Sequence, residues 1–563
     1  MNTLLKILLF IPCCSISLIS TAQQVSELTD PHPGSQECWD DLKSINLVWG
    51  NTDKRYSRHQ VSQGTKTITL SAWRGERVAA QALLSTPRHI QSMSFTISDL
   101  KKGKAVIPAS QIKRYFVRYV LGDMKEVRGD TVLVADYLAE IDKMTLAANT
   151  TRPIWLDIKV PAQAEPGTYK GTVIVDCDGE TLSLPLKLNV STHLLPQPKD
   201  WAFHLDLWQN PYAVARYFNV PLWSDTHFQL MRPIIQQYAA AGGKVITCSI
   251  IEHPWNSQTY DPFETMIVKM RQTDGSWKYD YTVFDKWVNF MMSVGVTQQI
   301  DCYTLVPWHY QFEYYDSASD SVKHLKCKPT DPQYREFLLP FLKDFAKHLK
   351  EKGWFSRTCI AMDERPMDQL EAAWRVVTEA DPDYRIEGAA DYNIDQGSIG
   401  AKMYDISVCF QFNIFDKEIL NARKQNGQKL TFYTACTPLR PNTFTLSQPA
   451  ESAFLGLHAA AINYDGYLRW ALNSWPQRPC QDARFGNWLS GDTYLLYPEG
   501  TSIRFERLIE GIQLYEKIRI LRDTTPSKRL KSLETLLSTI TFTKVPDDFD
   551  FGAFVEKVKR ATF

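Results

Sequence analysis

Residues 358–366 read TCIAMDERP, a mostly apolar run followed by two adjacent carboxylates, an arginine and a proline. The run at residues 358–362 is typical of a buried strand, and Pro366 would end its pairing. Because neighbouring side chains of a strand point to opposite faces, Asp363 and Glu364 can meet one substrate only where the strand ends and the backbone turns. The stretch therefore predicts a strand with a functional carboxylate pair at its carboxyl end. The alternative is a solvated strand end at which Glu364 pairs with Arg365.

Seven other strands are predicted outward from this one, at residues 201–208, 244–251, 299–306, 385–390, 405–410, 429–435 and 466–472. Helical patterns are clearest at residues 224–240, 284–294 and 331–352, and a last helix is predicted at 502–521. A hairpin is predicted as an insertion between residues 265 and 281. Strands that alternate with helices or loop-rich segments predict an α/β fold, a (β/α)8 barrel of the TIM type. A doubly wound sheet is the alternative, but no glycine-rich phosphate turn follows the first strand.

The pattern before residue 198 is different, because short alternating segments are separated by turns rich in proline and glycine. Residues 154–160 and 171–175 are examples, with a turn at residues 165–169 between them. This period-two rhythm predicts an antiparallel β-sandwich, either structural or carbohydrate-binding, and we favour the structural role. The predicted organisation is a signal peptide at 1–22, an N-terminal β-sandwich domain at 23–198 and a catalytic barrel with a C-terminal helical segment at 199–563.

The first 22 residues carry Lys6, an apolar run interrupted by Pro12, and a small-residue site that ends at Ala22. This pattern is typical of a secretory signal peptide and is too short for a membrane anchor, so we expect an exported protein, periplasmic or secreted. A lipoprotein anchored through Cys13 or Cys14 is the less favoured alternative. No later stretch is long and apolar enough to predict a membrane span.

The composition argues against several classes of function. The 563 residues include 63 basic and 63 acidic side chains with no basic tract, so no nucleic-acid partner is expected. The cysteines form no CxxC pair, and we expect no metal site and no cofactor. Aromatic residues, in contrast, make up 12% of the chain. Their rings either fill the core or serve as platforms for sugars or bases.

Active sites of such barrels lie at the carboxyl ends of the strands, which is where aromatic, amide and carboxylate side chains gather in this sequence. We predict that Asp363 and Glu364 are catalytic. The candidates for substrate binding follow the other strands, and they are Trp208, His253, Trp308, Tyr392, Asn393, Tyr433, Trp470, Asn473 and Trp475. Rings can stack on the apolar faces of sugars while amides and carboxylates bind hydroxyls, so this set predicts a sugar pocket.

Four motifs carry a family resemblance. They are IAMDERP at 360–366, YTAC at 433–436, WALNSW at 470–475, and YP at 497–498 leading to SIRFERLIEGIQ at 502–513. With these motifs the chain resembles glycoside hydrolase family 123, the exo-acting β-N-acetylgalactosaminidases, over nearly the whole mature chain. The resemblance implies a retaining enzyme in which the substrate's own acetamido oxygen attacks the anomeric carbon. It also implies that Asp363 stabilises the acetamido group and that Glu364 acts as acid and then as base.

Terminal β-linked N-acetylgalactosamine (GalNAc) on a glycolipid or another glycoconjugate is the partner that this resemblance implies. Two alternatives stay open. One is another hexosaminidase specificity, for example β-linked N-acetylglucosamine (GlcNAc). The other is a non-catalytic glycan-binding protein on the same fold, although an intact Asp363–Glu364 pair argues against it. The sequence leaves the oligomeric state unknown.

Overall fold

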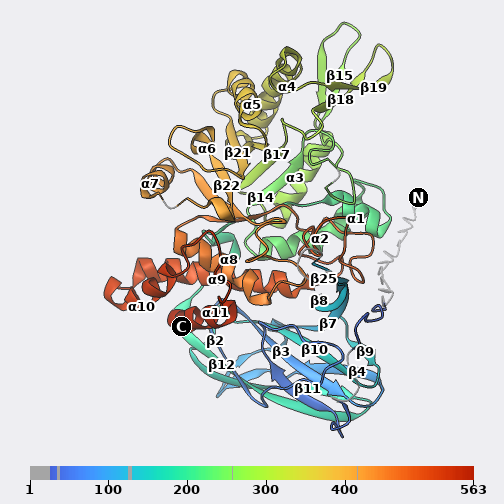
Figure 1. The fold of residues 1–563 in the computed structure, drawn as a ribbon, viewed down its shortest axis with the longest axis vertical. Helices are drawn as coiled ribbons and strands as arrows, with labels where there is room; N and C mark the ends of the chain where they lie inside the picture. Colours follow the sequence, from blue (N-terminus) through green and yellow to red (C-terminus); the bar gives the residue numbers. More distant parts are fainter. Residues whose placement is uncertain (1–25, 34–38, 125–129, 257, 415) are drawn as a thin grey trace, which may run out of the picture.

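The structure is a computed structural model that describes residues 26–33, 39–124, 130–256, 258–414 and 416–563. The predicted signal peptide, residues 1–22, lies outside the described residues. Two bodies are stacked along the long axis of the molecule, with the N-terminal strands below and the parallel strands above (Figure 1). The chain therefore changes architecture about where the sequence pattern changes.

The N-terminal part consists of two β-sheets that share one hydrophobic core. The first sheet has the order β1-β3-β10-β7-β8-β25, and the second has β2-β12-β11-β4-β9 with β5 and β6 at its margin. Trp49 and Phe116 from the first sheet pack with Val173 and Leu186 from the second, as in a sandwich. The pairing is antiparallel as predicted, except that β2 runs parallel to β12. The bounds are β1 Asn46–Gly50, β2 Ile68–Arg74, β3 Arg77–Thr86, β4 Ile90–Ile97, β5 Leu100–Lys102, β6 Ala105–Ile107, β7 Ile112–Gly122, β8 Val132–Ala139, β9 Lys143–Leu146, β10 Thr150–Lys159, β11 Gly167–Cys177 and β12 Glu180–Leu194.

A strand from far along the chain completes the first sheet. β25 (Gly500–Ser502) pairs antiparallel with β8, and Gly500 lies opposite Ala139. A Cβ atom on Gly500 would lie 2.4 Å from the carbonyl oxygen of Leu138, so this close approach requires glycine. The part of the chain that follows the barrel strands thus contributes directly to the N-terminal sandwich.

Eight parallel strands form the second body. Their order is β13-β24-β23-β22-β21-β20-β17-β14, which is the sequence order of a barrel opened between its first and second strands. The isolated bridge between Leu205 and Gly243 joins these two strands, so the barrel is nearly closed. The bounds are β13 His204–Leu207, β14 Val245–Ser249, β17 Gln299–Tyr303, β20 Thr358–Met362, β21 Arg385–Ala390, β22 Asp405–Cys409, β23 Lys429–Tyr433 and β24 Gly466–Arg469.

Helices surround this sheet with less regularity than a (β/α)8 barrel predicts. α6 has only four residues, and an irregular segment, residues 470–499, separates β24 from β25 and the next helix. The bounds are α1 Pro211–Phe218, α2 Asp225–Ala240, α3 Thr282–Val294, α4 Pro332–Glu351, α5 Met367–Ala380, α6 Ile399–Lys402, α7 Lys417–Gln425, α8 Pro449–Ile462, α9 Ile503–Thr524, α10 Ser527–Ser538 and α11 Phe551–Thr562. The fold is mixed α/β with a parallel, nearly closed barrel sheet.

A small four-stranded sheet is inserted into the barrel and projects beside α4 (Figure 1). The predicted hairpin is present as β15 (Val268–Arg271) and β16 (Trp277–Asp280). A second hairpin, β18 (Gln311–Asp316) and β19 (Ser321–Lys326), joins it through parallel pairing of β15 with β18. The sequence does not predict this second hairpin, because β19 is mostly exposed and lacks an apolar face.

Helix α9 packs between the barrel and the sandwich, and it carries buried charges with partners on the sandwich. Each of these charges forms a short ion pair. The pairs are Arg504 Nε with Asp136 Oδ2 at 2.9 Å, Glu506 Oε2 with Arg77 Nη2 at 2.6 Å, and Lys517 Nζ with Glu76 Oε1 at 2.5 Å. Because both members of each pair are largely withdrawn from water, the two bodies are fixed to each other through specific contacts.

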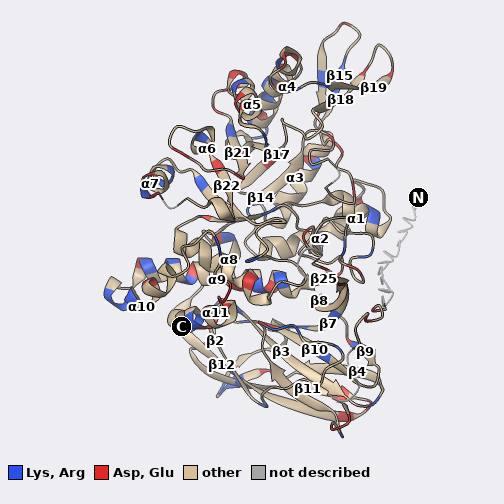
Figure 2. Ribbon diagram, viewed as in Figure 1, with Lys and Arg blue, Asp and Glu red and all other residues tan. Residues whose placement is uncertain are grey.

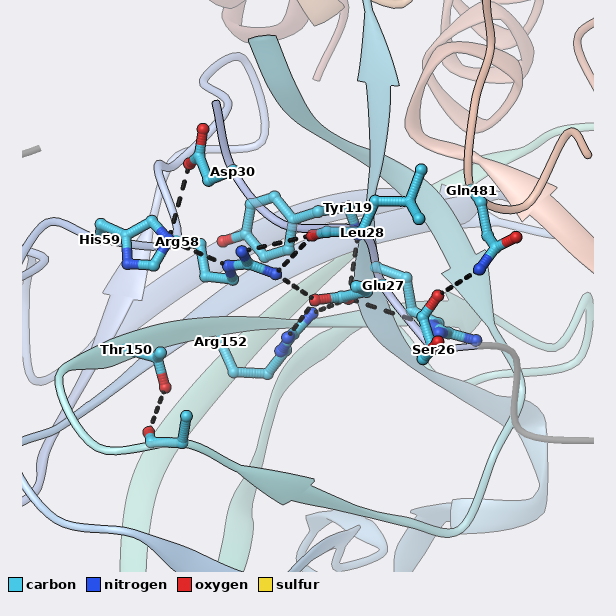
Figure 3. A network of polar contacts seen from close by, with 12 residues as sticks. Ser26, Glu27, Leu28, Asp30, Arg58, His59, Tyr119, Thr150, Arg152 and Gln481 are labelled. Carbon is cyan, nitrogen blue, oxygen red and sulfur yellow. Dashed lines mark hydrogen bonds and ion pairs between the residues drawn. The ribbon is translucent and has the colours of Figure 1, made fainter. Parts of the chain in front are cut away.

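The first described residues also bind to the sandwich through a charge network (Figure 3). The Arg152 guanidinium donates to both Glu27 carboxylate oxygens, at 2.6 and 2.9 Å. Arg58 and the backbone N–H of Tyr119 also donate to this carboxylate. Burial opposes the charge on Glu27, but Arg152, the Tyr119 N–H and the charge of Arg118 outweigh it and lower the pKa of Glu27 to about 2.

Charges of both signs are mixed over the two bodies (Figure 2). This distribution agrees with the net charge of zero and offers no single-signed surface for a polyanion. Among the helices of the described residues, none combines the length and the hydropathy needed to cross a bilayer.

Candidate active site

Asp363 and Glu364 follow β20 directly, at the carboxyl end of the barrel sheet. Pro366 stands at the N-cap position of α5, so residues 363–366 form the whole connection from strand to helix. The backbone turns at the predicted place. Asp363 is 8% exposed, and Glu364 is half-buried.

The loop after the third barrel strand holds Asp363. The indole Nε1–H of Trp308 donates to Asp363 Oδ2 at 2.9 Å. The backbone N–H of Glu364 donates to Asp363 Oδ1 at 2.9 Å. Burial raises the pKa of Asp363 above its ordinary value, and these two donors act against that rise. Both oxygens of Asp363 are therefore held in fixed directions.

The seventh strand holds Glu364. The Tyr433 hydroxyl, at the end of β23, donates to Glu364 Oε1. Burial, and then the neighbouring charge of Asp363, raise the pKa of Glu364 to about 7, although the Tyr433 bond opposes the rise. A carboxyl group with a pKa near neutrality can both give and take a proton at physiological pH.

Arg365 does not form the ion pair with Glu364 that a solvated strand end would favour. Its guanidinium lies over the rings of Trp308 and Tyr310, 4.6 and 4.9 Å from their centroids. This cation–π contact fixes the loop that carries Trp308, and through it the donor to Asp363. The pair and the loop after the third strand therefore form one unit.

An aromatic floor packs at the strand ends next to the pair. Trp208 lies 4.9 Å from Trp255 and 4.4 Å from Tyr303, measured between ring centroids. These rings share a buried cluster with Ala361 of β20 and with Tyr433. Tyr303 is not among the residues predicted for the site. It alternates with Gln299 and Asp301 on one face of β17, and this period of two is the signal of an inward-facing side chain.

The three site residues predicted after the eighth strand, Trp470, Asn473 and Trp475, lie in different surroundings. Trp470 packs partly buried against the aromatic floor, and its Nε1–H donates to Asp492 at 3.0 Å. Asn473 exchanges two 2.9 Å hydrogen bonds with the backbone of Asn210, and it is 2% exposed. Trp475 is fully buried in the main barrel core and donates to the Leu496 carbonyl at 2.7 Å. The buried side chains of Asn473 and Trp475 therefore contribute to the packing of the fold.

Three predicted residues lie on other strand ends. Tyr392 is half-buried and packs against the main core, whereas Asn393 is exposed. His253 is half-buried in the loop after β14, with φ at +45°. The structure therefore gathers Trp208, Trp308, Tyr433 and Trp470 next to Asp363 and Glu364, and it places Tyr392, Asn393 and His253 around them on neighbouring loops.

The interior of the barrel beneath this floor is polar. His204 Nε2 lies 3.0 Å from Asp405 Oδ2, and Gln299 Nε2 donates to the same oxygen at 2.8 Å. These residues come from β13, β22 and β17, none of which are neighbours in the sheet, so their contacts cross the barrel. Burial opposes the charge of Asp405, but His204 and Gln299 outweigh it and lower its pKa.

Three further buried carboxyl groups share this interior, and they are Asp206, Asp301 and Glu387. Burial, and then the neighbouring acids, raise the pKa of Asp301 and of Glu387 well above their ordinary values. Burial also raises the pKa of Asp206 to about 7. Asp206 Oδ2 accepts the indole N–H of Trp208 at 3.2 Å, which links the interior to the aromatic floor.

Comparison with known families identifies both bodies. The family profile described as "Glycoside hydrolase 123, catalytic domain" matches residues 208–521. The profile described as "Glycoside hydrolase 123 N-terminal domain" matches residues 49–177. Comparison with curated proteins gives no match.

Among solved structures, a family 123 glycoside hydrolase from Clostridium perfringens, described for glycolipid glycan hydrolysis, superposes with a TM-score of 0.85. It is 25% identical, and the alignment covers 92% of this chain and 98% of that one. β-Glucuronidase 3 from Bacteroides uniformis is 9% identical over 84% of this chain and 52% of its own, and its TM-score of 0.29 indicates no shared overall fold. Since the catalytic profile alone spans more than half of the sequence, the chain belongs to glycoside hydrolase family 123.

Proposed function

We propose that this protein is a retaining exo-β-N-acetylgalactosaminidase that removes terminal β-linked GalNAc by a substrate-assisted mechanism. One observation carries the proposal. Two adjacent carboxyl groups end the fourth barrel strand, and each is held by a different donor, Trp308 for Asp363 and Tyr433 for Glu364. Different surroundings are what two carboxylates need if they are to perform different tasks.

Glu364 is the acid and base of this proposal. With a pKa of about 7 it is largely protonated just below neutrality, so it can protonate the leaving oxygen as the glycosidic bond breaks. The substrate's acetamido oxygen attacks the anomeric carbon at the same time and forms an oxazolinium ion. Glu364, now a carboxylate, then takes a proton from the water that opens this ring. Two displacements at the same carbon retain its configuration.

Asp363 is the partner of the acetamido group. Its carboxylate accepts the acetamido N–H and stabilises the positive charge that develops on the ring. The fixed donors on both oxygens leave it a defined direction in which to accept a further hydrogen bond. Because no enzyme nucleophile bonds to the sugar, the distance rule for paired carboxylates of other glycosidases does not apply.

The sugar itself would rest against aromatic rings. Trp308 and Trp470 are partly exposed at the strand ends. Arg365 lies over one face of Trp308, so the sugar would stack on the exposed part of these rings that Arg365 does not cover. Trp208 lies deeper, in the buried cluster against which Trp470 packs. A terminal GalNAc on a glycolipid is the substrate we propose, in line with the activity described for the Clostridium perfringens relative.

The test is release of GalNAc from β-GalNAc and β-GlcNAc glycosides by the wild type, Glu364→Gln and Asp363→Asn. We expect faster turnover of the galacto epimer. Glu364→Gln should slow an unactivated glycan about 10²–10⁴-fold and an activated aryl glycoside much less, because a good leaving group needs no acid. Asp363→Asn should slow both substrates alike.

Glu371→Gln is the matched control, because Glu371 is an exposed glutamate on α5. It should keep the wild-type rates. Wild-type rates in both active-site variants would refute the assigned roles. Preference for β-GlcNAc would leave the mechanism and change the specificity, and sugar binding without turnover of any β-hexosaminide would indicate a glycan-binding protein.

We also propose that the protein is exported by the signal peptide at residues 1–22. Expression of the full sequence in a bacterial host, followed by N-terminal sequencing of the periplasmic protein, tests this proposal. A mature N-terminus near Gln23 is the expected result. An uncleaved protein in the cytoplasm would contradict it.

A further inference from the structure

A small cavity opens beside the candidate active site. Its volume is about 180 Å³, and it is lined by Glu252, His253, Pro307, His309 and Gln311. The first two residues follow the second barrel strand, and the others follow the third. The cavity is smaller than the roughly 300–1,000 Å³ of pockets that enclose whole drug-sized ligands, so it suits part of a larger substrate.

The cavity adjoins the catalytic pair through one loop. Trp308, whose indole holds Asp363, stands between Pro307 and His309, which both line the cavity. Arg365, next to Glu364, stacks on the same loop. Because the second, third and fourth strands are neighbours in the sheet, their carboxyl ends lie side by side. A substrate bound at Asp363 therefore has this cavity immediately next to it.

One oxygen of a buried carboxylate in the cavity lacks a donor. Glu252 is 8% exposed, and its Oε2 accepts the backbone N–H of Glu313 at 3.0 Å. Oε1 is also buried and has no hydrogen-bond partner among the described residues. An unsatisfied buried acceptor costs about 1–3 kcal/mol, so the site is suited to a ligand that brings a hydroxyl donor. His253, His309 and Gln311 add donors and acceptors for further hydroxyls.

The loops that form the cavity are strained. His253 and Tyr310 have φ values of +45° and +54°, in the left-handed region that side chains with a Cβ atom avoid. Such residues cost on the order of 1–3 kcal/mol each and are common where a loop clamps a ligand. The strain and the unsatisfied carboxylate are independent observations, and both point to a ligand site.

We propose that this cavity is the subsite for the second sugar of the glycan, a hexopyranose linked through its hydroxyl to the terminal GalNAc. Glu252 accepts a hydrogen bond from one hydroxyl of this sugar, and His309 binds another. The inference rests on the proposed exo-glycosidase function, since it names the leaving-group side of that reaction. It makes the enzyme selective for oligosaccharides over glycosides with a small aglycone.

The experiment compares a trisaccharide that ends in β-GalNAc with 4-nitrophenyl β-GalNAc, using the full-length enzyme. The ratio of kcat/KM for the trisaccharide to that for the aryl glycoside is measured for the wild type, Glu252→Gln and His309→Ala. Glu371→Gln is again the matched control, because Glu371 is exposed on α5 and does not line the cavity. Thermal unfolding of each variant is recorded as well.

We expect the ratio to fall about tenfold in both cavity variants, mainly through KM of the trisaccharide, as the loss of one hydrogen bond predicts. The control should keep the wild-type ratio. If Glu252→Gln unfolds, His309→Ala decides alone, because His309 is exposed. An unchanged ratio, or an equal loss on both substrates, overturns the subsite while the glycosidase function stands. A wild type that hydrolyses neither substrate overturns both proposals.

Discussion

Buried charges in the two halves of this molecule are handled in opposite ways. On α9, at the contact with the sandwich, each buried charge has a partner of opposite sign, as in Arg504 with Asp136 and Lys517 with Glu76. Inside the barrel, Asp206, Asp301 and Glu387 face one another, and His204 pairs with Asp405. In the first arrangement a basic partner opposes the effect of burial, which still raises the pKa of Glu76. In the second, neighbouring acids add to burial and raise the pKa of Asp301 and Glu387 further, and only Asp405, which pairs with His204, has a lowered pKa.

This difference separates two sources of stability. Paired charges at the interface stabilise the folded chain as long as both partners are present, and removal of one leaves the other stranded. Acids with raised pKa values stabilise it only while they hold their protons, so their contribution depends on pH. The interface should therefore be sensitive to mutation, and the interior of the barrel should be sensitive to pH.

The largest effect on the free energy of unfolding is expected when a buried ion pair of the interface is removed. In Arg504→Ala, the free energy of unfolding should fall by about 3–5 kcal/mol, because Asp136 loses its fully buried partner and keeps only Arg55 and the Tyr497 hydroxyl. The lost guanidinium also donates to the carbonyl oxygens of Thr443, Gly491 and Tyr494. Urea denaturation measures the change. Arg375→Ala is the control, because its pair with Glu371 is exposed and should cost under about 1 kcal/mol. If Arg504→Ala and Arg375→Ala lost the same free energy of unfolding, the buried pair would contribute no more than the exposed one.

The next effect tests the barrel interior through Asp206→Asn. The pKa of Asp206 is raised to about 7, so the folded chain keeps a proton that the unfolded chain releases from its ordinary pKa of 3.8 upward. Wild-type stability should therefore fall as pH rises through this window, by about 1.4 kcal/mol per unit for this group. The amide still accepts from Trp208 and does not titrate.

Urea denaturation at pH 5 and pH 8 compares the two proteins. Between pH 5 and pH 8, the free energy of unfolding of Asp206→Asn should rise by a few kcal/mol relative to that of the wild type. Asp395→Asn, at an exposed loop position, is the control and should show no such gain. Parallel pH dependence of Asp206→Asn and the wild type would mean that Asp206 titrates normally.

A smaller effect is expected at Glu27, a paired carboxylate at the edge of the sandwich (Figure 3). Because its pKa is lowered to about 2, its contribution is present above the ordinary value of 4.5 and is lost as pH falls toward 2. Glu27→Gln should cost about 1.5–3 kcal/mol at pH 7 and less at pH 3. The pH trend is thus opposite to that of Asp206. A larger cost at pH 3 than at pH 7 would contradict the pairing.

The smallest effect concerns the acid itself. The Tyr433 hydroxyl bond lowers the pKa of Glu364, so its removal in Tyr433→Phe should raise that pKa further. The upper limb of the kcat/KM profile against pH, which falls as Glu364 loses its proton, should move up by roughly half a unit to one unit. Tyr404→Phe, at the amino end of β22, is the control. A shift to lower pH would show that Tyr433 does not stabilise the charged form.

Much of the barrel could be predicted from the sequence, because its strands are short apolar runs between helical patterns. The predicted strands at 358–362 and 385–390 have the bounds of β20 and β21, and the predicted helix at 224–240 begins one residue before α2. The hairpin β18–β19 was not predictable, since β19 is polar and mostly exposed. β25, with three residues, is too short to leave a pattern.

The site could be predicted only as far as strand ends are predictable. Asp363 and Glu364 follow a run with a clear strand pattern, so their position is as expected. Asn473 and Trp475 follow β24 in an irregular segment, where side-chain direction does not follow from period two, and both pack inward. The bond from Trp308 to Asp363 joins residues 55 positions apart and needs the closed sheet to form.

The pairing of β25 with β8 also sets the order in which the molecule can be completed. During synthesis from the N-terminus, β8 has been made more than 350 residues before Gly500 exists. Until then one edge of the sandwich remains open and able to pair with another chain. Closure of that edge occurs only when the barrel strands and the start of α9 have been made. The sandwich is therefore finished last, although it is translated first.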